Sequence, residues 1–188
     1  MGAPPRRALP DSALLGMALF VFTEVMFFAG FISAFVIVQG GSPPGAWPPP
    51  GQPRLPIAQT AFNTLALLAS GVALFVAGQR LRAARPMSAE RWLVAAVGLG
   101  AYFVVAQGIE WVGLLRQGLT LTSSQLGSFF YVIVGTHALH AVVAIVFLGL
   151  AWRALRIGRL TAPGLGAVQL FWYFVVLVWP VLYWKVYL

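Results

Sequence analysis

The fold is decided by residues 13–38, ALLGMALFVFTEVMFFAGFISAFVIV, a predominantly apolar run with Glu24 near its middle. Each helical residue rises about 1.5 Å, so this run is long enough to cross the roughly 30 Å hydrocarbon core of a bilayer. A carboxyl group at that depth is costly. We therefore expect Glu24 to be kept neutral, to be paired inside a helical bundle, or to belong to a proton path.

The composition is that of a polytopic membrane protein. The chain has 188 residues, of which 60% are hydrophobic and 9% charged, and its mean hydropathy is +0.87. Its net charge of +8 does not indicate nucleic-acid binding, because the arginines cluster between the apolar runs, as membrane topology would place them. The chain has no cysteine, so it supplies no disulfide, thiolate metal ligand, covalent haem attachment or iron–sulfur site.

Five apolar runs predict an all-α, five-transmembrane-helix bundle that occupies residues 1–188 as a single membrane domain. The first run is about twice the length of a signal-peptide core and has no cleavage site, so we expect it to be retained. The proline-rich stretch 42–56 predicts an extended surface loop. The expected helices cover residues 12–38, 57–78, 91–115, 125–152 and 164–187.

The distribution of basic residues predicts the orientation. If the runs alternate across the membrane, one side holds nine arginines and the other holds three basic residues, Arg54, Arg116 and Lys185. The positive-inside rule then places the N-terminus inside and the C-terminus outside. The nine arginines are Arg6, Arg7, Arg80, Arg82, Arg85, Arg91, Arg153, Arg156 and Arg159.

Four ionisable residues in the apolar runs form the candidate site, a buried polar cluster of Glu24, His137, His140 and Glu110. The histidines are three residues apart and share a helix face. Depth matching favours Glu24 beside one or both of them, and we expect a neutral Glu24 hydrogen-bonded to His137 or His140. A cluster that locks the helices together and a role near a proton path both remain open. We expect no metal site, because di-metal bundles need more carboxylates than these two and a Glu-x-x-His pattern on one helix, which this sequence lacks.

The aromatic residues of the last run predict two environments. Trp172 to Phe174 lie deep enough to pack on neighbouring helices or lipid. Those from Trp179 onward predict an outer interfacial belt.

These features, in chain order, resemble subunit III of the haem–copper terminal oxidases, the cytochrome c oxidase subunit III family. Residues 22–31, FTEVMFFAGF, resemble the Glu-bearing helix of that family, and Gln107, Glu110 and Trp111 resemble its Gln-x-x-Glu-aromatic motif. The other matching stretches are WPPPG at 47–51, FNTLALLASG at 62–71, SFFYVIVGTHALH at 128–140, and Trp172, Phe174 and Trp179 of the last run.

The resemblance implies the five-helix form of the family, in which the two missing helices are often carried by an enlarged subunit I. It implies an accessory subunit with no catalytic residue, metal or cofactor of its own, in a complex that couples oxygen reduction to proton translocation. Such a subunit packs on the haem- and copper-bearing catalytic subunit I beside other oxidase subunits, supports its stability and proton uptake, and binds phospholipid. The sequence departs from the family pattern where Gly166, Tyr173 and Val176 replace its usual Glu, His and Asp.

This resemblance predicts an integral protein of the inner (cytoplasmic) membrane of a bacterium, with no nucleic-acid partner. Two alternatives remain, a paralogous subunit of a nitric oxide reductase and a stand-alone proton-coupled transporter. The chain has no repeats or broken helices of the kind that transporters commonly carry, which disfavours the second. Anionic lipid headgroups are expected at two inner loops, whose candidate residues are Arg80, Arg82, Arg85, Arg153, Arg156 and Arg159.

Overall fold

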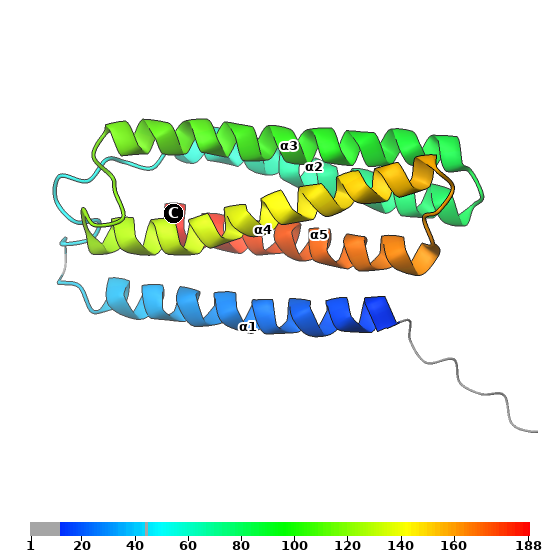
Figure 1. The fold of residues 1–188 in the computed structure, drawn as a ribbon. Helices are drawn as coiled ribbons and strands as arrows, with labels where there is room; N and C mark the ends of the chain where they lie inside the picture. The colour runs from blue at the N-terminus through cyan, green and yellow to red at the C-terminus, as the bar shows by residue number, and fades with distance from the viewer. Residues whose placement is uncertain (1–11, 44) are drawn as a thin grey trace, which may run out of the picture.

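The computed structural model describes residues 12–43 and 45–188, and these residues form a bundle of long helices (Figure 1). The helices are α1 (Ser12–Gly40), α2 (Ile57–Arg82), α3 (Pro86–Arg116), α4 (Gln125–Arg156) and α5 (Ala162–Leu182), and α5 continues into a π-helical turn, η1 (Tyr183–Tyr187). The described residues contain no strand. Within the described residues, five helices are long and apolar enough to span a membrane, which confirms the predicted five-helix, all-α fold.

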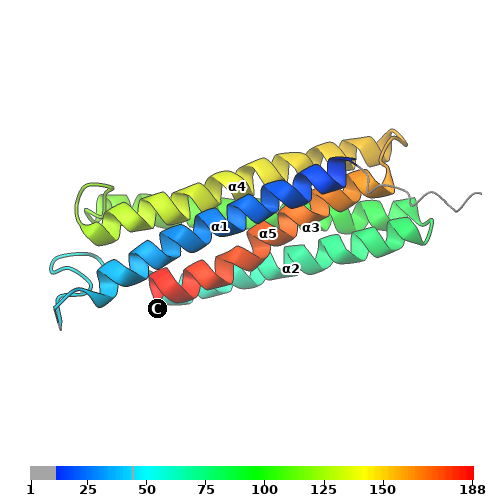
Figure 2. The same cartoon turned by 90° about the horizontal axis from the view of Figure 1, so that it is seen from below.

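The helices are arranged in three layers (Figures 1 and 2). Helices α2 and α3 form one outer layer and share the most extensive contact in the bundle. Helices α4 and α5 form the middle layer. Helix α1 forms the other outer layer, where it contacts α5 and, less extensively, α4. Helix α1, which carries Glu24 near its middle, therefore lies at the edge of the bundle rather than at its centre.

Most of the helices extend beyond the predicted ranges, chiefly at one end of the bundle. Helix α3 begins at Pro86, before the apolar run that starts near Arg91, and α4 continues to Arg156. Proline is well suited to the first turn of a helix, because its fixed φ is helical and it has no N–H to leave unpaired. Hydropathy marks the part of a helix that matches the lipid, whereas the polar end turns continue in water.

Tryptophans of α5 join the middle layer to α2. The indole nitrogen of Trp172 donates to Ser70 Oγ at 2.9 Å, and that of Trp179 donates to Thr64 Oγ1 at 2.8 Å. Both indoles are fully buried. The expectation that Trp179 belongs to an interfacial belt was therefore wrong, because a hydroxyl on α2 satisfies its N–H inside the bundle.

Small residues on the neighbouring helices admit these large side chains. A Cβ atom at Gly100 would lie 2.6 Å from the Trp172 ring, so only glycine leaves room for that indole. Gly71 lies against Val176, whose Cγ1 would be 3.2 Å from a Cβ at this glycine. Close approach of this kind is the main source of helix association in a bilayer.

Candidate functional site

The four predicted site residues do not form a single cluster. Glu24 of α1 pairs with His140 of α4, whereas Glu110 of α3 is bound by side chains of α2. His137 hydrogen-bonds to neither carboxyl group and stacks on Trp179. The structure therefore has two separate carboxyl sites with a buried histidine as a third feature.

The Glu24–His140 pair joins the edge helix α1 to the middle layer. Glu24 Oε2 lies 3.0 Å from His140 Nε2, and His140 Nδ1 lies 2.8 Å from the carbonyl oxygen of Thr136. A carbonyl can only accept, so Nδ1 carries a hydrogen. Nε2 then either accepts from a protonated Glu24 or, in an imidazolium, donates to a carboxylate. The two forms differ only in which side of the pair holds one proton.

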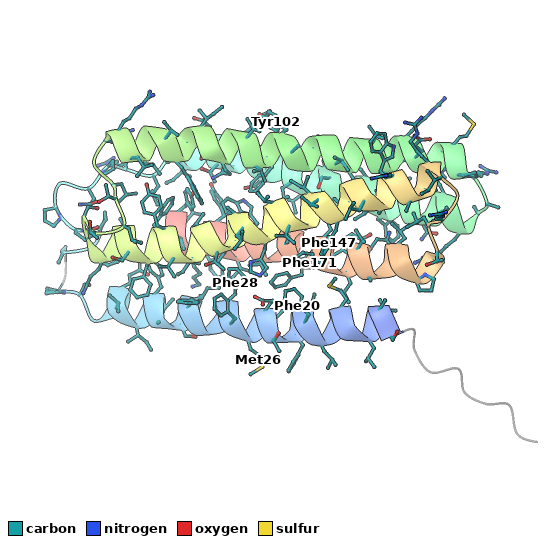
Figure 3. All side chains as sticks on the ribbon, viewed as in Figure 1. Phe20, Met26, Phe28, Tyr102, Phe147 and Phe171 are labelled. Carbon is teal, nitrogen blue, oxygen red and sulfur yellow. The ribbon has the colours of Figure 1, made fainter. Side chains whose placement is uncertain are left out.

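Aromatic rings surround this pair. Phe28, Phe171 and Phe174 each lie with their ring centroids about 6 Å from that of His140. In Figure 3, Phe20 and Phe28 lie on the side of α1 that faces α5, with Phe171 opposite them. These rings exclude water from most of the pair, which makes a missing hydrogen-bond partner costly.

Replacement of Glu24 is expected to separate hydrogen bonding from charge. Glu24→Gln should leave assembly nearly intact, because the amide can still donate to His140 Nε2. Glu24→Leu strands that nitrogen and should lower the free energy of unfolding by about 1–3 kcal/mol. Co-purification with partner subunits measures assembly, and denaturant titration of the purified protein in bicelles measures the free energy of unfolding. If Glu24→Gln alone disrupts the complex, the charge itself is required.

Glu110 lies at the centre of the second carboxyl site, which α2 and α3 build together. Its Oε2 accepts from Thr60 Oγ1 at 2.8 Å, and its Oε1 accepts from the Asn63 amide at 2.8 Å. The same Asn63 amide donates to Gln107 Oε1 at 3.1 Å, and the Gln107 amide reaches the Tyr187 hydroxyl at 3.4 Å. Glu110 thus has two buried donors at hydrogen-bond distance.

The sequence-based prediction missed Thr60 and Asn63 as partners of Glu110, and Tyr187 as a partner of Gln107. A signal for the first two exists, because Thr60, Asn63 and Thr64 recur at helical spacing within an apolar run and so share one face of α2. Such a polar face inside a membrane helix predicts a polar partner on a neighbouring helix. Nothing comparable predicts Tyr187, which reaches Gln107 from η1 at the C-terminal end of α5.

The six arginines proposed for lipid headgroups lie at one end of the bundle, in the last turns of α2 and α4 and in the loops that follow (Figure 1). Arg156 is engaged within the protein, because its Nε lies 3.6 Å from Glu90 Oε1 and its guanidinium stacks over Trp152. Trp152 also donates to Glu90 at 3.1 Å. Arg6 and Arg7, which entered the charge count, lie outside the described residues.

The described residues contain no group of three or more His, Cys, Asp or Glu side chains that could hold a metal ion. The two histidines on one helix also diverge, since His140 turns to Glu24 and His137 to Trp179. The chemistry open to the site residues is hydrogen bonding and proton sharing.

Comparison with known proteins adds an independent finding. Residues 7–188 match the sequence model of a family described as Cytochrome c oxidase subunit III. A protein of Synechocystis named Cytochrome c oxidase subunit 3 is 31% identical over 183 residues, which cover 95% of this chain and 76% of the relative. Relatives of the same name in Thermostichus vulcanus and Lemur catta are 27% and 32% identical. The matches cover 88% of the former and 64% of the latter, so the chain spans under two thirds of the lemur protein.

Proposed function

Because the chain belongs to the cytochrome c oxidase subunit III family and is thus an accessory subunit of a haem–copper oxidase complex, we propose that it packs on the catalytic subunit I. We propose that it supports the stability and the proton uptake of that catalytic subunit. The haems and copper would then belong to that partner. The chain would act as a single membrane domain whose Glu24–His140 pair holds one proton inside the membrane.

The uncovered face of α1 is the observation that carries this proposal. Only Phe28 and Phe35 of this helix are buried. Leu15, Leu19 and Met26 share one face and are about half exposed or more, and Figure 3 shows Met26 pointing away from the bundle. Apolar surface gains little from burial between helices in lipid, so a partner would hold this face by close packing. The helices of subunit I are the proposed partner.

Photocrosslinking tests the partner directly. Benzoylphenylalanine in place of Met26 should crosslink, in native membranes, to a haem-bearing polypeptide. The control is the same substitution at Val105 of α3, because the two side chains are matched in exposure at 61% and 62%. Val105 faces outward from the opposite layer and should crosslink chiefly to lipid. Equal crosslinking from both positions, or lipid adducts alone from position 26, would contradict the proposal.

We further propose that the basic end of the bundle faces the cytoplasm of a bacterium and that the protein lies in the inner membrane. The α2–α3 and α4–α5 loops share that end, whereas Arg54, Arg116 and Lys185 lie toward the other. This asymmetry follows the positive-inside rule. A cysteine introduced at Ala84 should be labelled by a membrane-impermeant maleimide only after the cells are opened, and one at Gln117 in intact spheroplasts. The reverse pattern would invert the topology.

Phospholipid is the proposed non-protein ligand at the basic end. Arg80, Arg82, Arg85, Arg153 and Arg159 would hold anionic headgroups by charge. Arg156 contributes less, because Glu90 already partly compensates its charge.

A further inference from the structure

A cavity opens on the flank of the bundle between α3 and α4. Its volume is about 130 Å³, and it lies within the membrane-spanning lengths of both helices. The two helices approach each other near the basic end and diverge toward the other end (Figure 1). Gly108 and Ala138 line the cavity with the smallest side chains available, and no atom lies within 4 Å of where a Cβ at Gly108 would be.

Two of the side chains that line this cavity carry buried nitrogen atoms that have no hydrogen-bond partner among the described residues. His137 is 1% exposed, and neither of its ring nitrogens has a hydrogen-bond partner among the described residues. The indole nitrogen of Trp111 is also buried and unpaired. Both side chains line the cavity. Unpaired buried polar groups of this kind are rare in folded proteins, and each one needs a physical explanation.

Apart from Gln107, the remaining walls are aromatic and apolar. Phe103 and Trp179 line the cavity, and the imidazole of His137 stacks on Trp179 with ring centroids 5.1 Å apart. An engineered apolar cavity of about 150 Å³ accepts benzene, so a cavity of this size holds one six-membered ring. Apolar walls with a few convergent polar groups are typical of small-molecule sites.

We propose that this cavity binds a neutral, ring-bearing amphiphile with one hydroxyl group, of the phenol class, which enters from the hydrocarbon core of the membrane. A hydroxyl group both donates and accepts. It would accept from the Trp111 indole N–H and donate to the unprotonated nitrogen of His137, while the ring packs between Phe103 and Trp179. The nitrogens of Trp111 and His137 have almost no surface open to the cavity, so small rotations of both side chains would bring them to the guest.

A photoreactive alkylphenol that carries a diazirine tests the site in the purified oxidase complex. The probe should label peptides of α3 and α4 saturably, and excess unmodified alkylphenol should compete. The matching alkylbenzene probe, which lacks the hydroxyl group, should label these peptides several-fold less. His137→Phe keeps a ring against Trp179 but removes the nitrogens, and it should bring the two probes to equal labelling.

Two glycines of α3 provide a matched pair of variants. Gly108 and Gly98 are both exposed, and a Cβ at either would have no atom within 4 Å. Only Gly108 lines the cavity. Gly108→Leu should therefore abolish saturable labelling, whereas Gly98→Leu should leave it unchanged.

Three results would overturn the proposal. They are labelling that does not saturate, labelling that is indifferent to the hydroxyl group, and labelling that survives Gly108→Leu. The first is expected if the cavity holds only water or lipid tails. Because the readout is labelling of this chain and not oxidase activity, its outcome is independent of the proposed role in proton uptake.

Discussion

Trp172→Ala is expected to lower the free energy of unfolding by about 3–5 kcal/mol, the range for removing a large buried aromatic side chain. Trp172 is 0% exposed and fits the space that Gly100 leaves open. The substitution leaves a void between three helices and removes the hydrogen bond to Ser70. In a bilayer, where close packing rather than exclusion of water joins the helices, that void directly removes van der Waals contacts.

Unfolding in mixed micelles of increasing denaturing detergent measures this change. Trp184→Ala is the matched control, because Trp184 lies near the end of the same segment and is 62% exposed. That variant should lose less than about 0.5 kcal/mol, as is usual for a surface substitution. Similar losses for the two variants would show that the α2–α3–α5 contact does not depend on the Trp172 indole.

Asn63→Leu is expected to produce the second large effect, a loss of about 2–6 kcal/mol in the free energy of unfolding. The Asn63 amide donates to both Glu110 and Gln107. Its removal strands two buried acceptors, each at a cost of about 1–3 kcal/mol. Gln59→Leu is the control, because Gln59 lies one turn earlier on α2 and is exposed.

A double variant tests the cause of that loss. Asn63→Leu combined with Glu110→Leu should recover part of the stability, because no carboxyl group is then left without its amide donor. The same detergent titration reports the coupling between the two positions. Strictly additive losses would show that the Asn63–Glu110 hydrogen bond contributes little.

The family assignment adds to what the geometry supports. Neither the Glu24–His140 pair nor the Glu110 site by itself identifies an oxidase subunit, because helix-locking polar pairs occur in many membrane bundles. The family match over residues 7–188 indicates that the chain is a subunit of an oxidase complex. The geometry then locates the groups of this chain that can share a proton.

Two family positions show how this chain differs locally. Val176, where the sequence resemblance led us to expect an Asp, packs against Gly71 as an apolar contact. Tyr173 stands where the resemblance led us to expect a His, and its hydroxyl lies 3.5 Å from the amide of buried Gln169, which also donates to the Leu74 carbonyl. The last helix therefore makes polar contacts with α2 through Gln169 as well as through Trp172 and Trp179.

The number of helices, their approximate extent and the class of protein could all be predicted from the sequence alone. A run of about 20 or more apolar residues is long enough to span a membrane. In lipid such a run forms a helix, because every backbone group must then be paired within the segment. The ordered motifs around Glu24, Glu110 and His140 identified the family. The sequence also located all four ionisable residues inside or near the membrane, since their cost in lipid makes them stand out against the apolar background.

Which of these residues meet follows from the packing of the helices and could not be predicted from the sequence. His137 and His140 share a helix face, so both were candidate hydrogen-bond partners of Glu24. Helix α1 packs at the edge of α4 and α5, and in that position Glu24 pairs with His140. Helices α2 and α3 pack closely along their lengths, so Glu110 hydrogen-bonds to Thr60 and Asn63 and not to a histidine. Helical spacing fixes which side chains share a face, but the rotation and neighbours of each helix depend on packing with the others, and one sequence run does not contain that information.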